Sequence, residues 1–136
     1  HLKINYFTNL IIIEKLLNEM KKKKFGRIYL TSSVGTKYGG SEETLYYSLS
    51  KYLNEFHPNY LRKLIKFNIT LNTIMIGVVD TKFHKKIKNK NMSERIKLTP
   101  FKKLITIDQM SDSIYNVITN KDNLFINTLI NLTNGE

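Results

Sequence analysis

The sequence predicts an α/β chain built around a parallel β-sheet. Three strand-like runs, over residues 26–32, 68–76 and 126–132, alternate with stretches whose apolar residues recur at helical spacing. Strands separated by helices favour a parallel sheet, because neighbouring parallel strands need a long crossover between them. The run over 68–76 is mostly apolar, as expected of a strand that is buried on both faces.

The first predicted helix covers residues 3–21. Its apolar residues recur every three or four positions and form one stripe. Lys21–Lys24 follow at its C-terminal end, where cations interact favourably with the helix dipole. Gly26 then leads into the strand over 26–32.

A loop over residues 34–45 separates this strand from the second predicted helix, over 46–66. The loop contains three glycines, and either Ser41 or Thr44 is expected to cap the helix. Pro58 lies inside the predicted helix, where a proline costs roughly 3 kcal/mol unless the helix kinks. We therefore expect a kinked helix at this point.

The last part of the chain begins with an irregular polar stretch over 80–103, with room for short helices. Thr106 and Gln109 have the spacing of a capping box, which predicts a helix from there to about Thr119. The strand over 126–132 completes the pattern. The sequence contains no internal repeat and no linker, so we expect a single domain.

Tyr47 and Lys51 stand four positions apart in the second predicted helix, so their side chains would lie on one face. A free phenol has a pKa of about 10, and an ammonium group close by stabilises the phenolate. Ser33, at the end of the first strand, would then polarise a carbonyl that takes the tyrosine proton. This pattern is typical of a carbonyl reductase, although each residue in isolation is also an ordinary surface or turn residue.

Further residues at compatible spacings surround this pattern. An asparagine lies in the first helix, and the second strand runs into a loop that contains a glycine and a threonine. In this order the chain resembles the classical branch of the short-chain dehydrogenase/reductase superfamily over nearly its whole length. The resemblance rests on Asn5, Ser33, Tyr47, Lys51, Asn72, Gly77 and Thr81, and on the C-terminal residues Thr133 to Glu136.

The resemblance implies a Rossmann-like, doubly wound parallel sheet and a nicotinamide cofactor, either NAD or NADP. It implies that Tyr47 is the general acid, that Lys51 stabilises the phenolate and holds the nicotinamide ribose, and that Ser33 binds the substrate carbonyl. Asn5 is expected to bend its helix and to hold a water molecule of a proton relay. The residues expected to bind the cofactor are Tyr47, Lys51, Gly77, Val79 and Thr81.

Two features depart from the family pattern. Ile76 stands where the family has a proline before the glycine, so the turn beside the nicotinamide is expected to be looser. No glycine-rich phosphate loop is present, and that loop belongs to the front half of a dinucleotide fold, where the choice between NAD and NADP is made. We therefore expect residues 1–136 to be the C-terminal part of one domain, either a fragment or a truncated gene product. Its catalytic segment covers 1–81, and 82–136 supply the substrate loop and the last helix and strand.

The expected substrate is a small carbonyl compound or alcohol, either free or bound to a carrier. The resemblance suggests a 3-oxoacyl-carrier-protein reductase or a sugar-modifying enzyme. Lys82–Lys90 would attract an acidic carrier or a nucleotide-linked substrate, or else form a solvated basic loop. The helices over 3–21 and 46–66 resemble those through which family members form homodimers and tetramers. The alternative is a catalytically inactive remnant or an oligomerisation module, because a sheet without its front half exposes a strand edge.

The net charge of +11 raises nucleic-acid binding as a rival function. The composition argues against it, since 19 of the 22 basic residues are lysines, whereas base and phosphate recognition favours arginine. There is no cysteine, and His1, His57 and His84 lack the spacing of metal ligands, so no metal site is expected. No apolar run reaches the ~18 residues of a membrane span, so we expect no membrane partner and a cytoplasmic location.

Overall fold

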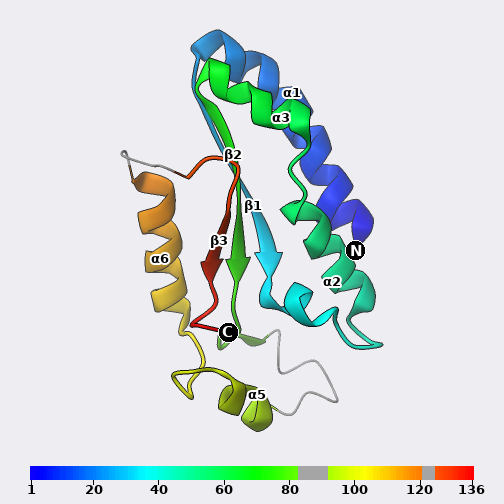
Figure 1. Cartoon of the computed structure of the whole chain (residues 1–136), viewed down its shortest axis with the longest axis vertical. Coiled ribbons are helices and arrows are strands. Elements are labelled where there is room, and N and C mark those ends of the chain that lie inside the picture. Colours follow the sequence, from blue (N-terminus) through cyan, green and yellow to red (C-terminus); the bar gives the residue numbers. More distant parts are fainter. Residues whose placement is uncertain (83–91, 121–124) are drawn as a thin grey trace.

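The computed structural model describes residues 1–82, 92–120 and 125–136, and it confirms the predicted α/β class (Figure 1). The described strands are β1 (Gly26–Ser33), β2 (Ile69–Ile76) and β3 (Leu129–Leu132). They form one parallel sheet in the order β1-β2-β3. This is the part of a Rossmann-like sheet that the sequence pattern predicts.

The register of the sheet aligns the carboxyl ends of its strands. β1 and β2 pair from Gly26–Ile69 to Ser33–Ile76, so both strands end at the same level. β3 is shorter than the predicted strand over 126–132 and joins only the second half of β2. The polar residues that follow β1 and β2 are therefore brought side by side at one edge of the sheet.

Helices cover both faces of the sheet, as a doubly wound fold requires (Figure 1). On one face lie α1 (Thr8–Lys23), α2 (Leu45–Tyr52) and α3 (Asn59–Arg62), and on the other lies α6 (Ile107–Thr119). A short helix, α5 (Met92–Leu98), lies beyond the carboxyl ends of the strands. None of the helices in the described part of the chain is long and apolar enough to cross a membrane.

The predicted continuous helix over 46–66 is wrong, because the chain is broken where it was expected only to kink. After α2, a 3-10 turn, η3 (Leu53–Glu55), ends at Phe56 in an extended conformation. Pro58 is extended as well, and α3 with the 3-10 turn η4 (Lys63–Phe67) follows it. Proline lacks a backbone N–H and disfavours helical geometry in the residue before it, which explains the interruption.

The ends of two other helices follow from local sequence. α6 begins with the predicted capping box, in which the Gln109 backbone N–H donates to Thr106 Oγ1 at 3.2 Å and the Thr106 N–H donates to Gln109 Oε1 at 3.0 Å. α1 ends at Lys23, and the residue that caps it, Lys24, adopts the left-handed conformation with φ of 50°. The predicted first helix begins with a π-helical turn, η1 (Lys3–Phe7), centred on Asn5.

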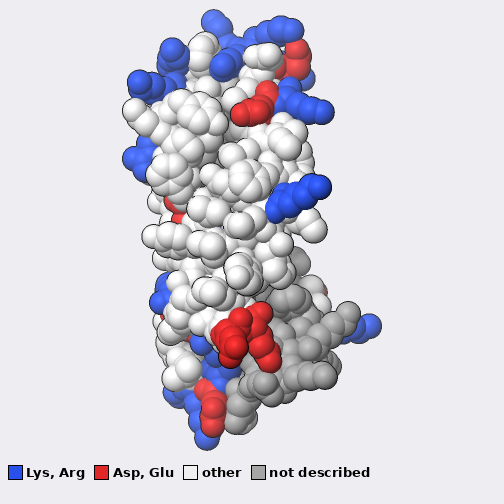
Figure 2. All heavy atoms as spheres, turned by 90° about the vertical axis from the view of Figure 1, so that its right-hand side faces the viewer, with Lys and Arg blue, Asp and Glu red and all other residues white. Residues whose placement is uncertain are grey.

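Charged side chains are distributed unevenly over the molecule. The side formed by α1, α2 and α3 carries them mainly toward its two ends, and its middle is largely uncharged (Figure 2). Large apolar side chains of these elements are exposed, in addition to those that pack against the sheet. The uncharged middle of this side is the kind of surface that mediates protein association.

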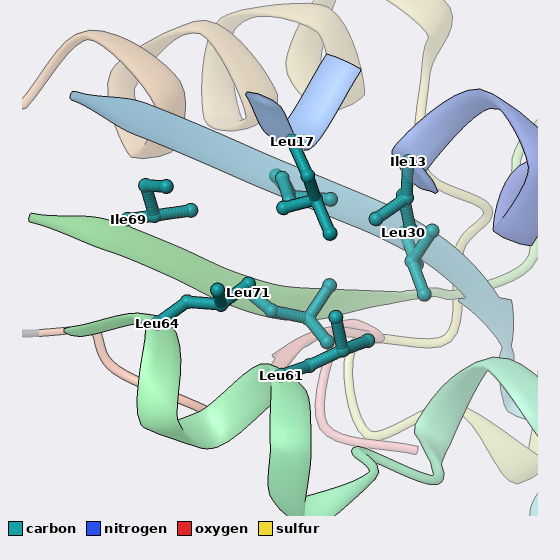
Figure 3. Packing of buried hydrophobic residues seen from close by; sticks show 8 residues of the cluster. Ile13, Leu17, Leu30, Leu61, Leu64, Ile69 and Leu71 are labelled. Atoms are coloured by element: carbon teal, nitrogen blue, oxygen red, sulfur yellow. The ribbon is translucent and has the colours of Figure 1, made fainter. Parts of the chain in front are cut away.

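The apolar core lies between the sheet and the α1–α3 layer (Figure 3). Apolar side chains from α1 and from the α3 region point onto the face of β1 and β2 that these helices cover. Burial of each such side chain contributes roughly 1.5–3 kcal/mol, so this layer fixes the helices on the sheet. The cluster consists of Ile13, Leu17, Ile28, Leu30, Leu61, Leu64, Ile69 and Leu71.

Candidate active site

A cavity of about 1170 Å³ opens at the carboxyl ends of β1 and β2. Its walls come from the end of β1, the following 3-10 turn η2 (Val34–Tyr38), α2, the segment after β2, and the inner sides of α5 and α6. Ligands of open α/β sheets bind outside the carboxyl ends of the strands, so its position is that of a substrate and cofactor site. The predicted residues that line it are Ser33, Tyr47, Lys51, Gly77, Val79 and Thr81.

The alternation of β1 separates the two serines at its end. Ser32 is buried and its hydroxyl donates to the Glu55 carboxylate, which also accepts from Thr36 Oγ1 at 2.8 Å. Ser33 is half-buried and its Oγ accepts from the Gly35 backbone N–H at 3.2 Å. Successive strand side chains point to opposite faces, so the two serines have different hydrogen-bond partners, and both line the cavity.

Tyr47 and Lys51 lie together on α2, as their spacing predicts. The Lys51 Nζ atom is 6.0 Å from the centroid of the Tyr47 ring, and the ring of His1 meets Tyr47 edge-on at 5.8 Å. Lys51 Nζ also donates to Thr31 Oγ1 at 3.0 Å and to the Thr31 carbonyl at 3.4 Å. Partial burial lowers the pKa of the Lys51 ammonium below its ordinary value of 10.5, because burial disfavours the charged form.

Asn5 does not line the cavity but is hydrogen-bonded to residues of α2 and η3. Its side-chain amide donates to Ser50 Oγ at 3.0 Å, and Ser50 Oγ donates to the Tyr47 carbonyl at 2.7 Å. Its own main-chain carbonyl accepts from Asn9 Nδ2 at 2.7 Å and from Asn54 Nδ2 at 3.0 Å. Its place in the π-helical turn fits the predicted bend of the helix, whereas its role in holding a water molecule stays a prediction.

Ser50 and Asn54 are fully buried polar residues that the sequence analysis did not select. They stand three and seven positions after Tyr47, so Tyr47, Ser50, Lys51 and Asn54 form one polar stripe on the inward side of α2 and η3. A polar stripe on a helix that must pack against a sheet was the available signal, and it indicates a buried hydrogen-bonded layer.

Gly77 owes its residue type to close packing. A Cβ atom at this position would lie 2.8 Å from Thr133 Cα and 2.9 Å from Ile105 Cδ1. The chain after β2 therefore passes too close to the end of β3 to carry a side chain there. Val79 continues the sheet with a bridge to Ile105, which holds the backbone of this segment at the cavity wall.

Contacts of Arg95 in α5 stabilise the outer wall of the cavity. Its guanidinium pairs with the Glu136 carboxylate and stacks over the Tyr38 ring at 4.7 Å. The Glu136 main-chain carbonyl also accepts a hydrogen bond from the Lys37 ammonium. These contacts join α5, η2 and the C-terminal residues into one side of the cavity.

Other candidates from the sequence are the histidines and the basic rim Lys82–Lys90. Among the described residues, no group of three His, Asp or Glu side chains is arranged as a metal site. His57 is buried beside Thr73, away from the cavity. Of the predicted basic rim Lys82–Lys90, all but Lys82 lies outside the described residues, as does His84.

The donor set fits the nicotinamide end of a dinucleotide. The cavity presents the Lys51 ammonium, hydroxyls of Ser33, Tyr47 and Thr81, and the backbone of the segment after β2. These are groups that can bind a ribose and a carboxamide. The sequence has no glycine-rich phosphate loop, so the fit extends to that end of the cofactor only.

A family model described as short chain dehydrogenase matches residues 1–92. The chain belongs to the short-chain dehydrogenase family. The matched region contains the whole of the α2 helix and both long strands, and with them every predicted site residue.

Curated relatives of this short-chain dehydrogenase chain are 3-oxoacyl-[acyl-carrier-protein] reductases of Buchnera aphidicola. The protein of the subspecies Baizongia pistaciae is 26% identical over 134 residues, which are 98% of this chain and 55% of the relative. The protein of the subspecies Schizaphis graminum is 24% identical and is likewise covered over 55% of its length. The chain thus spans about half the length of the curated relatives it matches.

Solved structures share the fold. An NADP-bound 3-oxoacyl (acyl-carrier-protein) reductase from Agrobacterium tumefaciens C58 matches with a TM-score of 0.81 and 19% identity, over 99% of this chain and 54% of that one. An NAD⁺-bound xylitol dehydrogenase also matches with a TM-score of 0.81, at 16% identity, over 98% of this chain and 58% of that one. The three-stranded parallel sheet is therefore part of the short-chain dehydrogenase fold.

Proposed function

We propose that this chain carries the proton-transfer half of an NAD(P)-dependent carbonyl reductase, which also oxidises the corresponding alcohol. One observation carries the proposal: Ser33 at the end of β1 and the pair Tyr47 and Lys51 on α2 line a single cavity at the carboxyl ends of the strands. The short-chain dehydrogenase family supports an oxidoreductase.

In this proposal the chain positions the substrate and moves a proton. The nicotinamide cofactor, when bound, supplies the hydride. Ser33 Oγ donates a hydrogen bond to the substrate carbonyl oxygen and holds it beside the Tyr47 hydroxyl. Tyr47 gives its proton to that oxygen as negative charge develops on it. The Lys51 ammonium, 6.0 Å from the tyrosine ring, stabilises the phenolate that remains.

The cofactor would be held by groups of the cavity wall. Lys51 and Tyr47 would contact the nicotinamide ribose, and the segment from Gly77 through Val79 to Thr81 would contact the carboxamide. Structural neighbours with NAD and with NADP bound support a nicotinamide cofactor without distinguishing the two.

The substrate we favour is a 3-oxoacyl thioester on an acyl carrier protein. The names of the curated relatives support this choice. The xylitol dehydrogenase among the structural neighbours makes a polyol or sugar derivative the second choice. The reaction is in the cytoplasm in either case, as expected from the sequence.

We further propose that the chain forms a homo-oligomer through the largely uncharged middle of the side seen in Figure 2. The exposed apolar residues there come from two neighbouring helical segments, so two copies would bury them against each other. They are Ile4, Phe7, Ile11, Ile12 and Leu16 of η1 and α1, and Leu45, Leu49, Tyr52 and Phe56 of the α2 region.

The test is turnover by the product of the longest open reading frame that contains this chain. Oxidation of NADH and of NADPH is followed with 3-oxoacyl thioesters and with small ketones and sugars. We expect Tyr47→Phe to lower kcat by about 10²–10⁴-fold, because the substituted ring cannot donate a proton. Tyr46→Phe is the matched control, since Tyr46 is 68% exposed and is not among the residues that line the cavity.

Unchanged turnover in Tyr47→Phe would exclude Tyr47 as the acid. Absence of binding of either cofactor would instead favour the second candidate, a catalytically inactive remnant that serves oligomerisation. The exposed apolar residues of α1 and α2 are the observation that supports an oligomerisation role.

A further inference from the structure

Asn54 is a fully buried polar residue one helical turn after Lys51. It lies in η3 with 0% of its surface exposed. Burial of an amide in an apolar layer costs free energy unless its groups are hydrogen-bonded. The buried side-chain amide of Asn54 therefore needs hydrogen-bond partners.

The partners of Asn54 come from four different elements, η1, α1, β1 and β2. Its Nδ2 donates to the main-chain carbonyls of Asn5 at 3.0 Å and of Thr31 at 3.1 Å. Its Oδ1 accepts from Asn9 Nδ2 at 3.4 Å, and its own carbonyl accepts from Thr73 Oγ1 at 2.6 Å. Asn54 thereby joins the start of the first helix to β1 and β2.

The Thr31 carbonyl is shared between Asn54 and Lys51. Lys51 Nζ reaches this carbonyl at 3.4 Å, which is long for a charge-assisted bond, and it reaches Thr31 Oγ1 at 3.0 Å. The Asn54 amide, at 3.1 Å, is the nearer donor. Competition from this amide limits how strongly the carbonyl draws the ammonium toward β1.

We propose that Asn54 is a positioning residue for Lys51: by occupying the Thr31 carbonyl it keeps the ammonium on the Tyr47 side of the cavity. It touches neither substrate nor cofactor and acts through Thr31. The importance of this position for catalysis rests on the proposed function, whereas the effect of Asn54 on Lys51 does not.

Asn72 provides a matched comparison within the same sheet. It too is an asparagine with 0% of its surface exposed, on β2. Its Nδ2 donates to the Phe125 carbonyl at 2.9 Å, and its Oδ1 accepts from the Thr128 N–H at 3.2 Å. These partners belong to the segment that leads into β3, and they include none of the residues that line the cavity.

The test measures the titration of the Lys51 ammonium in the full chain by NMR of ¹³C-labelled lysine, with the signal assigned through Lys51→Arg. In Asn54→Leu the Thr31 carbonyl loses its competing donor, so the bond from Lys51 shortens and the charged form is stabilised. We expect the pKa of Lys51 to rise by about half a unit or more. Asn72→Leu should lose comparable stability and leave the Lys51 titration unchanged.

An unchanged Lys51 titration in folded Asn54→Leu would overturn the proposal, and so would an equal shift in Asn72→Leu. If Asn54→Leu does not fold, Asn54→Ala decides, because it removes the donating amide nitrogen without adding bulk or a charge near Lys51. The same rise in the Lys51 pKa is expected there, and no rise would overturn the proposal.

A second readout uses the enzyme of the proposed function. There Asn54→Leu should lower kcat by about tenfold, because about 1.4 kcal/mol of transition-state stabilisation is a factor of ten, while Asn72→Leu retains the unmutated value. Absence of turnover in the unmutated product would count against the proposed function alone, since the Lys51 titration still decides the role of Asn54.

Discussion

The side chains that line the cavity take their positions from partners that lie outside it. Ser32, which also lines the cavity, is held by the Glu55 carboxylate, and Ser33 accepts a hydrogen bond from the Gly35 N–H. Ser33, Tyr47 and Lys51 are predictable from the sequence, since their spacing is local. The polar stripe on α2 and η3 indicates that Asn54 is buried, but nothing in a single sequence shows that it faces a strand carbonyl 23 positions away.

His57 is the residue from which we predict a pH dependence of stability. It is 6% exposed, and its Nε2 lies 2.9 Å from Thr73 Oγ1, whose proton goes to the Asn54 carbonyl, so Nε2 carries a hydrogen. Burial lowers the pKa of His57 below 6.5; a hydrogen bond with the Asn127 backbone opposes this, and the nearby Arg62 charge adds to it.

Because the pKa of His57 is lower in the folded state, the unfolded chain takes up the proton at higher pH. The free energy of unfolding should therefore fall as pH is lowered from about 6.5 through the folded pKa. Urea titrations at a series of pH values measure this fall. His57→Gln, which retains an amide donor toward Thr73, should reduce the slope in this range. An identical slope in the variant would assign the dependence to other groups.

At the scale of secondary-structure elements, the predictions are correct where particular residue types determine the local backbone geometry. The capping box of α6 and the strands β1 and β2 are confirmed close to their predicted limits. The helix over 46–66 was wrong because periodicity alone does not show whether a proline kinks a helix or ends it. The π-helical turn η1 also depends on distant contacts, since Asn5 is bonded to Ser50 and Asn54.

The capping box gives a prediction for α6. Thr106→Ala removes the oxygen that accepts the Gln109 N–H, and it should lower the free energy of unfolding by about 1 kcal/mol. Thr106→Ser keeps that oxygen and should retain most of the stability. Urea denaturation of the three proteins checks this expectation. Equal loss in both variants would mean that the threonine methyl group, rather than the cap, stabilises the start of α6.

At the scale of the whole molecule, the sequence predicted the parallel sheet and the edge at which the site lies. The outer wall of the cavity was not predictable, because it depends on the pairing of Arg95 with Glu136 and its stacking on Tyr38. The sequence carries no local sign of such contacts between α5, η2 and the C-terminal residues. They arise only when the chain has folded around the sheet.

A charge placed in the uncharged middle of the side formed by α1, α2 and α3 tests the proposed homo-oligomer. Leu49→Glu should shift the chain to a smaller species in analytical ultracentrifugation, because a buried unpaired carboxylate costs several kcal/mol. Tyr115→Glu is the control, since Tyr115 is 64% exposed on α6, on the opposite face of the sheet. If the unmutated chain sediments as a monomer, or if both variants behave alike, this side is not the interface.

The residues that line the cavity come from separate regions of the sequence. Every residue proposed to contact the reacting atoms lies between Ser33 and Thr81, whereas α5 and α6 contribute another part of the described wall, from positions 94 to 111. A single recombination event downstream of Thr81 would therefore exchange the α5 and α6 part of the wall and keep all the residues proposed for proton transfer. Variation in one part of the sequence can in this way leave the other part unchanged.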